Sequence, residues 1–467
     1  MTPDRCQQPS ETLMPPRLLI SALRKSSGKT TLSIGVAAAF AARGLEVRTF
    51  KKGPDFIDPM WLAKASGAVC RNLDFFMMGT RRVRDHFIRH AQGCGLALIE
   101  GNHGYFDGQD LEGGDCAAAL AELLQTPVVL VVDCKGASRG VAALVQGHLD
   151  FPGGQWIRGV ILNHVASPRH EKRLRQALAR YCPVPVVGCV PHSGSLSIEE
   201  RHLGLQPVAE EERLLARIQE IRDGITPYVD WEALLALARS APPLTGSAPP
   251  MVRPVPASRL RVAMAMDQST HFYYPENLEA LREAGVELLP FSLLNDASLP
   301  DADGLYIGGG FPEMFMERLA GNRGLLDQIR DGAAAGLPVY AECGGVMVLA
   351  EQLRWGDREA RMIGALSIEL RMEKRPVGYG YMEIEGSDAL SWPGAGRRQA
   401  CHEFHHSRVT RVGEGVRFAF RVTRGFGVDG KHDGLLYRNI LASYAHVHAQ
   451  AAPDGPISSH HSGVQKS

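Results

Sequence analysis

The chain has 467 residues, which is too long for a single hydrophobic core, so two or more domains are expected. Lysine plus arginine and aspartate plus glutamate number 51 each, which argues against nucleic acid or an anionic membrane as the main partner. No apolar run approaches the ~20 residues that span a bilayer, and the nine cysteines include no CxxC spacing, so a cytoplasmic protein without a disulfide framework is expected.

The first predicted domain follows a polar, proline-rich segment at residues 1–16, which we expect to be a disordered tail. An apolar run at 18–21 predicts a buried strand, the apolar face of 30–43 predicts a helix, and 47–50 begins a second strand. This order predicts a βαβ unit. Later segments continue the same α/β pattern, so the domain is predicted to cover 17–239.

The turn between the first strand and the first helix carries a phosphate-binding pattern, RKSSGKTT. Backbone N–H groups of such a turn cradle phosphates, the lysine reaches the β- and γ-phosphates, and the first threonine hydroxyl ligates Mg²⁺. Leu23 stands where an ordinary P-loop has its first glycine, so a fortuitous turn is the alternative. The predicted ATP-binding residues in this turn are Ser27, Gly28, Lys29, Thr30 and Thr31.

Three later apolar strands are predicted to end in a polar residue, namely Glu100, Asp133 and Asn163. Because the carboxyl ends of parallel strands meet at one edge of a sheet, these side chains are expected to share the nucleotide site. Glu100 is expected to be directed at Mg²⁺, and Asn163 at the nucleotide base or a loop. Asp55 and Asp58 follow the second strand and are candidates for Mg²⁺ or a second substrate, with turn formation beside prolines as the alternative.

A proline-rich stretch without periodicity at 240–258 predicts a linker between two domains. After it, predicted strands and helices alternate again, which indicates a second α/β domain at 259–449. The last segment, 450–467, is expected to be a second disordered tail.

The second domain contains a predicted strand that turns abruptly into a helix through Glu-Cys-Gly-Gly. Such a turn exposes its central side chain at the sheet edge, so Cys343 is a candidate nucleophile, with an inert buried thiol as the alternative. The amino end of the following helix is expected to lower the pKa of this thiol. Gly344, together with Gly309 and Gly310 of a second glycine turn, is expected to supply N–H groups to an oxyanion.

Two histidine-bearing segments follow the cysteine, CHEFHHS at 401–407 and ASYAHVHA at 442–449. In the second segment Tyr444, His446 and His448 alternate with small or apolar residues, as on a half-buried strand. One of the histidines in these two segments is expected to take the thiol proton.

In this order, the motifs resemble the cobyrinic acid a,c-diamide synthase family of glutamine-dependent amidotransferases. The resemblance runs from about residue 18 to 448 and implies a dethiobiotin-synthetase-like P-loop domain with a parallel sheet, followed by a class I glutamine amidotransferase domain. It is carried by SGKTT, KKGPDFIDP, RNLDFFM, IEGNHGYFDG, ERHLGL, FYYPENLEALREAG, YIGGGFPE, AECGGVMVL, HEFHHS and SYAHVH.

The resemblance implies two linked reactions. Cys343 hydrolyses L-glutamine with His446 as the base, without the third carboxylate that is usual in this class of amidase. The ammonia then converts a tetrapyrrole carboxylate, activated by ATP and Mg²⁺ as an acyl phosphate, into an amide. The implied contacts with this acceptor are Asp58, Asp74 and Arg201. The protein so implied is a cytoplasmic ligase that binds neither nucleic acid nor membrane, and a homodimer is left open.

The chain departs from the family pattern in its P-loop, where KSSGKTT replaces SGSGKTT, and in STHFYY and CHEFHHS. We expect these changes to preserve both reactions, but they do not determine which tetrapyrrole is the acceptor. The a and c carboxylates of cobyrinate come first, and sirohaem or nickel-sirohydrochlorin are alternatives. Cobyric acid synthase, CTP synthase and a P-loop regulator with an inactive amidase-like domain are the remaining alternatives.

Overall fold

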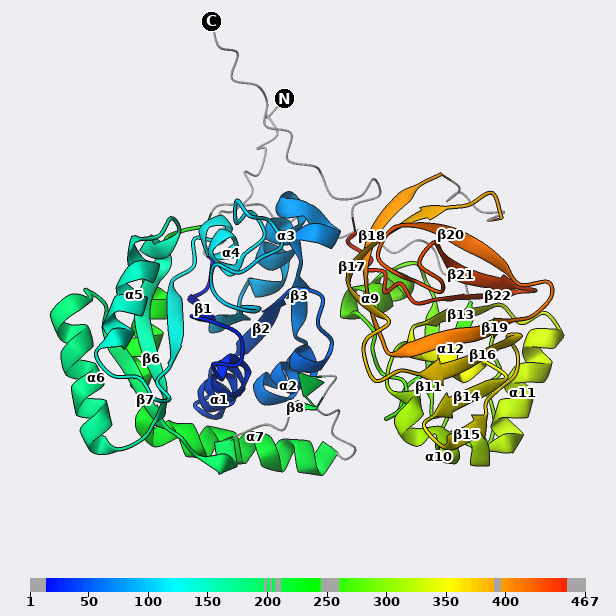
Figure 1. Ribbon diagram of the computed structural model, residues 1–467, viewed down its shortest axis with the longest axis horizontal. Helices are drawn as coiled ribbons and strands as arrows, with labels where there is room; N and C mark the ends of the chain where they lie inside the picture. Colours follow the sequence, from blue (N-terminus) through cyan, green and yellow to red (C-terminus); the bar gives the residue numbers. More distant parts are fainter. Residues whose placement is uncertain are drawn as a thin grey trace, which may run out of the picture. The chain divides into compact units, whose positions relative to one another are not determined.

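The computed structural model describes residues 14–196, 200–201, 204–205, 211–244, 260–389 and 396–451 (Figure 1). Most of the predicted linker and of both predicted tails lies outside these residues. The chain divides into two compact units. Unit 1 consists of Met1–Phe75 and Thr80–Pro250, and unit 2 consists of Phe76–Gly79 and Met251–Ser467.

Unit 1 is built on a seven-stranded parallel sheet with the order β3-β2-β4-β1-β5-β6-β7. The chain moves outward from β1 through β2 to β3, returns at β4, and continues on the other side of β1. The carboxyl ends beside β1 therefore form the switch point at which such sheets bind ligands. The strands are β1 (Arg17–Ala22), β2 (Val47–Lys52), β3 (Arg71–Leu73), β4 (Leu96–Glu100), β5 (Val128–Asp133), β6 (Ile157–Val165) and β7 (Val186–Pro191).

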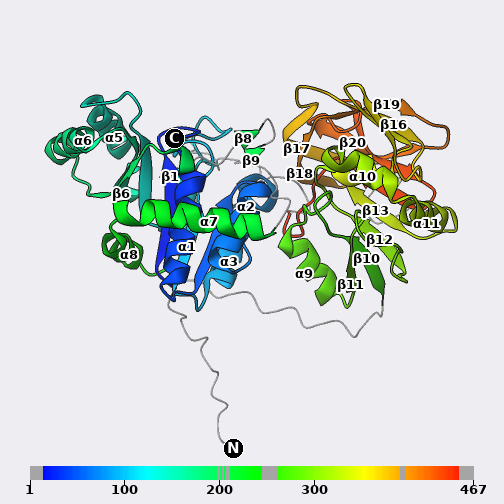
Figure 2. The same cartoon turned by 90° about the horizontal axis from the view of Figure 1, so that it is seen from below.

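Helix α1 is buried along most of its length because α7 crosses it on the side away from the sheet (Figure 2). A Cβ atom added at Gly35 of α1 would lie 2.4 Å from Cδ1 of Ile225, so the glycine permits this close crossing. The helices of this unit are α1 (Lys29–Ala42), α2 (Ile57–Ser66), α3 (Phe75–Ala91), α4 (Ala117–Leu123), α5 (Gly140–Asp150), α6 (Pro168–Tyr181), α7 (Glu211–Ile225) and α8 (Trp231–Arg239). A short antiparallel pair joins β8 (Glu200–Arg201) to β9 (Gly204–Leu205).

Unit 2 contains a nine-stranded sheet with the order β11-β10-β12-β13-β22-β21-β20-β17-β18. Its part from β11 to β22 is parallel, and the strands beyond β22 are antiparallel. The strands are β10 (Arg261–Ala265), β11 (Glu287–Phe291), β12 (Gly304–Ile307), β13 (Val339–Glu342), β17 (Gly378–Gly386), β18 (Arg398–His405), β20 (Arg417–Arg424), β21 (His432–Tyr437) and β22 (Ile440–Ser443).

A four-stranded sheet accompanies the large one and has the order β15-β14-β16-β19. Its strands are β14 (Gln352–Trp355), β15 (Arg358–Arg361), β16 (Ile368–Met372) and β19 (Ser407–Val412). The helices of unit 2 are α9 (Pro275–Glu283), α10 (Met316–Gly321), α11 (Arg323–Ala334) and α12 (Gly344–Leu349), and a 3₁₀ turn, η4, covers Pro312–Phe315. The alternation of strands and helices in both units confirms the predicted α/β class.

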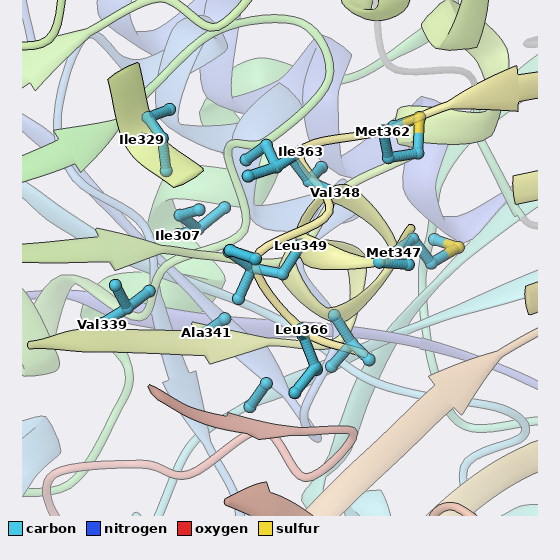
Figure 3. Packing of buried hydrophobic residues seen from close by; sticks show 14 of the residues in the cluster. Ile307, Ile329, Val339, Ala341, Met347, Val348, Leu349, Met362, Ile363 and Leu366 are labelled. Carbon is cyan, nitrogen blue, oxygen red and sulfur yellow. The ribbon is translucent and has the colours of Figure 1, made fainter. Parts of the chain in front are cut away.

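Helix α12 lies within the main hydrophobic cluster of unit 2, as Figure 3 shows. All six of its residues are buried, so it has no polar face, as expected of a helix enclosed by a core. Met347, Val348 and Leu349 contact a cluster that includes Ile307 of β12 and Val339 of β13. This packing fixes the turn that joins β13 to α12. Among the described residues, no helix is both long and apolar enough to cross a bilayer.

Candidate functional site

The turn between β1 and α1 has the backbone of a phosphate-binding loop. Gly28 adopts φ 87°, a left-handed conformation that favours glycine, and α1 begins at the next residue, Lys29. The first N–H groups of a helix have no partner within it and therefore attract anions. A Cβ atom at Gly28 would lie 2.3 Å from Nδ2 of Asn163, which donates a hydrogen bond of 2.9 Å to the carbonyl oxygen of Ser27. Asn163 thus contacts the loop, which is one of its two predicted targets.

A largely buried cluster of one lysine, two carboxylates and a hydroxyl lies beside this turn. Thr30 Oγ1 donates to Glu100 Oε1 at 2.7 Å and lies 3.4 Å from Asp58 Oδ2. Lys51 Nζ, at the end of β2, lies 2.5 Å from Asp58 Oδ2 and 2.9 Å from Glu100 Oε1. The structure therefore brings together Thr30 and Glu100, as predicted, and adds Lys51, for which no role was predicted from the sequence.

The charges in this cluster shift one another's pKa values. Burial and then the neighbouring Lys51 lower the pKa of Lys29, to about 8. Burial alone would lower the pKa of Lys51, but Asp58 and Glu100 reverse this and raise it. Burial raises the pKa of Glu100. For Asp58, burial opposes ionisation but Lys51 outweighs it, so its pKa is lowered. Lys51 is thus the ammonium that compensates these buried carboxylates.

The oxygen donors of the cluster fit Mg²⁺ when a nucleotide supplies further ligands. Mg²⁺ is typically held in nucleotide sites by one or two carboxylates, a hydroxyl and phosphate oxygens. Glu100 Oε2 is buried and has no hydrogen-bond partner among the described residues, so it is available to a ligand. Thr30 and Asp58 provide further oxygens at the same place. Within the described part of the chain, no three His, Cys, Asp or Glu residues gather closely enough to hold a metal alone.

We expect Lys51→Met to destabilise the protein by about 3–5 kcal/mol, because it leaves the buried carboxylate of Glu100 and the partly buried one of Asp58 without their shared cation. Urea unfolding followed by circular dichroism measures this loss. Lys172→Met, at an exposed position on α6, is the matched control. A free energy of unfolding equal to that of the control would show that Lys51 is not needed to compensate the carboxylates.

Of the other predicted residues of unit 1, Asp133 has partners outside this cluster, whereas Asp55 is a neighbour of its Asp58. Asp133 contacts His164 Nδ1 at 2.8 Å and Arg24 Nη2 at 3.0 Å, and the latter contact is largely exposed. Asp55 accepts a 2.8 Å hydrogen bond from the N–H of Ile57, at the start of α2, which fits the turn role given above as the alternative to metal binding. Burial and the neighbouring Asp58 raise the pKa of Asp55 to about 7.

The three residues predicted to contact the acceptor, Asp58, Asp74 and Arg201, have different surroundings. Asp58 belongs to the Lys51 cluster described above. Asp74 is buried. Burial lowers the pKa of Lys52, and the carboxylate of Asp74 acts in the opposite direction without cancelling this effect. The backbone of Arg201 pairs in β8, but its side chain lies outside the described residues. His103 is a further basic group for which no role was predicted, and its pKa is lowered by burial and then by nearby lysines.

The turn after β13 has the geometry of a nucleophile elbow. Cys343 adopts φ 46° and ψ −98°, a strained conformation for a residue other than glycine. A Cβ atom at Gly344 would lie 2.8 Å from the backbone nitrogen of Gly310, and one at Gly345 would lie 2.5 Å from the carbonyl oxygen of Ile307. The elbow and the second glycine turn therefore touch through their backbones, and glycine is required for this contact.

His446 lies against the same glycine turn. A Cβ atom at Gly309 would lie 2.6 Å from Cε1 of His446, and the His446 ring stacks on His402 with centroids 4.8 Å apart. Nδ1 of His446 lies 3.6 Å from Oε2 of Glu342, the residue directly before Cys343, and both side chains are 2% exposed. Tyr340 donates a 2.8 Å hydrogen bond to the other oxygen of Glu342. A buried carboxylate thus faces the imidazole, although its place in the sequence differs from that of the usual third member.

The remaining histidines have different surroundings. Tyr274 Oη lies 3.1 Å from Nδ1 of His402, and burial lowers the pKa of that histidine well below its usual range. His448 Nε2 lies 3.3 Å from Oε2 of Glu276. His405 Nδ1 lies 2.9 Å from the carbonyl oxygen of Ser407. Of these rings, His446 is the one that lies against the Gly309–Gly310 turn.

The predicted lowering of the Cys343 pKa is wrong for the free protein. The side chain is 4% exposed, and burial raises the pKa of the thiol, with the carboxylate of Glu313 as the next cause. The helix that follows has only six residues, so its amino end is a small counterweight. A base close to the sulfur is therefore needed to generate the thiolate.

Two family models match the chain and together cover most of it. Residues 20–205 match the CobQ/CobB/MinD/ParA nucleotide binding domain. Residues 261–453 match the CobB/CobQ-like glutamine amidotransferase domain. These matches confirm the predicted P-loop domain and glutamine amidotransferase domain, in that order.

Curated relatives match nearly the whole chain. A cobyrinate a,c-diamide synthase of Magnetococcus marinus is 55% identical over 449 residues, which cover 94% of this chain and 95% of that protein. Proteins of the same description from Methanosarcina acetivorans and Archaeoglobus fulgidus are 37% and 38% identical, with 93% of this chain covered in each case and 93% and 94% of those proteins. With both domains and this identity along nearly its full length, the chain belongs to the cobyrinate a,c-diamide synthase family of glutamine-dependent amide ligases.

Proposed function

We propose that the protein uses ATP, Mg²⁺ and L-glutamine to convert the a and c side-chain carboxylates of cobyrinate into amides. The observation that carries this proposal is the 55% identity to a cobyrinate a,c-diamide synthase over 94% of the chain. The phosphate-binding turn of unit 1 and the cysteine elbow of unit 2 supply the two chemistries that this reaction needs.

In unit 2, Cys343 is proposed to attack the carboxamide carbon of L-glutamine. His446 takes the thiol proton, and N–H groups of Gly344 and the Gly309–Gly310 turn stabilise the oxyanion that forms. The C–N bond then breaks, and the imidazolium returns its proton to the leaving nitrogen, which departs as ammonia. Water hydrolyses the thioester to glutamate and restores the thiol. Glu342 is proposed to hold His446 in orientation throughout.

In unit 1, a carboxylate oxygen of the acceptor is proposed to attack the γ-phosphorus of ATP, so that ADP leaves and an acyl phosphate forms. Lys29 contacts the transferred phosphoryl group, and the N–H groups from Gly28 to Thr31 hold the other phosphates. Thr30, Glu100 and Asp58 would hold Mg²⁺, which neutralises charge on the phosphate oxygens when bound. Ammonia attacks the acyl carbon, and the amide and inorganic phosphate are released.

This assignment changes the role proposed for Asp58. Its contacts with Lys51 and Thr30 favour the metal side of the nucleotide over the acceptor. Asp74 is proposed to act on the acceptor indirectly, by holding the buried ammonium of Lys52. Asp55, which is tied to the start of α2, is proposed to shape this loop more than to ligate the metal.

Mass spectrometry of the tetrapyrrole product tests the proposal. Purified protein, ATP, Mg²⁺ and L-glutamine are incubated in parallel with cobyrinate and with sirohaem. We expect cobyrinate to gain two amides, with glutamate and ADP formed in matching amounts. Amidation of sirohaem with unchanged cobyrinate would contradict the proposed acceptor. Absence of glutamate and ADP with every acceptor would contradict the ligase and favour a regulatory protein.

A further inference from the structure

Glu313 is a buried carboxylate for which the reaction described above has no use. It belongs to the 3₁₀ turn η4, Pro312–Phe315, which follows the Gly309–Gly310 turn directly. The residue is 2% exposed, and its Oε2 has no hydrogen-bond partner among the described residues. An unsatisfied buried carboxylate oxygen is unfavourable for folding, so the fold alone gives no reason to place it here.

Glu313 belongs to a turn that packs against the cysteine elbow. Cδ of Pro312 would be 3.2 Å from a Cβ atom at Gly344, which places η4 against the elbow. After burial, the carboxylate of Glu313 is the largest cause that raises the pKa of the Cys343 thiol. Burial raises the pKa of Glu313 itself to about 7, and no cationic side chain of the described residues offsets this. A buried carboxylate that no cation of the described residues compensates therefore belongs to a turn packed against the cysteine elbow.

L-Glutamine, the proposed substrate, itself has a cationic group that could compensate this carboxylate. L-Glutamine presents a neutral carboxamide to the thiol, and at its other end it has one anionic and one cationic group, the α-carboxylate and the α-ammonium. A buried carboxylate repels the first of these and attracts the second. A charge-assisted hydrogen bond in such a dry position is strong and satisfies the open carboxylate oxygen.

We propose that Glu313 binds the α-ammonium group of L-glutamine and so selects this amino acid over carboxamides that lack an α-amino group. This inference rests on the proposed glutaminase reaction at Cys343 and adds a specificity-determining residue to it. The carboxylate acts on the end of the substrate remote from the bond that breaks, so its removal should weaken binding more than it slows chemistry.

The experiment compares two substrates and two variants. Glutamate or glutarate release is measured with L-glutamine and with glutaramate, which is glutamine without its α-amino group. We expect Glu313→Gln to raise KM for L-glutamine on the order of 30-fold, with kcat little changed and with a much smaller effect on glutaramate. Glu317→Gln is the matched control, because Glu317 is an exposed α10 residue that pairs with Arg358 at 3.1 Å.

An equal loss with both substrates would overturn the proposal, since a merely structural role affects them alike. Isothermal titration of Cys343→Ala, with Glu313 intact, gives a second test that needs neither the Glu313 variant nor turnover. L-Glutamine should bind at least ~10-fold more tightly than glutaramate, and equal affinities would overturn the proposal. A wild-type protein that binds and hydrolyses neither compound would instead contradict the proposed function.

Discussion

Cys343→Ala is expected to abolish amidation with L-glutamine while ammonium salts still support it. The substitution removes the sulfur that attacks the carboxamide, and loss of a nucleophile in a comparable catalytic unit costs at least ~1,000-fold in kcat. The phosphate-binding turn belongs to the other unit of the chain, so its contacts remain. Amide formation is measured by mass spectrometry with each nitrogen source at equal ATP.

Cys401→Ala is the control for this variant, because Cys401 is the other buried cysteine of the same unit and lies in β18. It should retain glutamine-dependent amidation. If ammonium failed to restore activity to Cys343→Ala while the control stayed active, the division of the reaction between two sites would be wrong. Undiminished glutamate release by Cys343→Ala would show that another group is the nucleophile.

Lys29→Ala is expected to remove amidation with either nitrogen source, by at least ~100-fold. The ammonium of Lys29 is buried at the first residue of α1, and burial together with Lys51 lowers its pKa to about 8. Bound phosphates would favour the charged form and raise that pKa, so part of the nucleotide's binding energy is expected to come from this lysine. Truncation removes that interaction from every step that involves ATP.

ADP and amide formation with ammonium chloride measure the effect of Lys29→Ala, and glutamate release measures what remains in the other unit. Lys25→Ala is the matched control, because Lys25 is exposed in the same turn. We expect the control to change rates only slightly. Near-normal ADP formation by Lys29→Ala would reject a phosphate role for this residue.

The parts of the nucleotide site that the sequence predicted depend on local patterns. A strand followed by SSGKTT places Thr30 at the start of α1, and an apolar strand ending in an acid places Glu100 at the sheet edge. Parallel strands bring such ends together, and the two side chains meet at 2.7 Å. Lys51 was missed because lysine is rarely buried and because β4 lies between β1 and β2. Its register partner, Glu100, comes from a strand far along the chain.

In the amidase site, too, the local turns were predicted from the sequence, whereas contacts between distant segments were not. The Glu-Cys-Gly-Gly turn and the glycine turn were predicted from their residues, and the structure joins them through Gly344 and Gly310. The raised pKa of Cys343 could not be predicted, because it depends on how completely strands and loops far apart in the sequence cover the sulfur. Glu342 and Glu313 stood inside the motifs that were recognised, yet their facing partners are set by tertiary contacts.

Lys51 has a consequence for the order in which ligands arrive. Its ammonium group already compensates Asp58 and Glu100 in the free protein. A divalent ion that arrives alone therefore gains little binding free energy at this edge of the sheet. A polyphosphate chain brings additional negative charge, which makes binding of the ion favourable. The metal and the nucleotide are thus expected to enter together, as a preformed chelate.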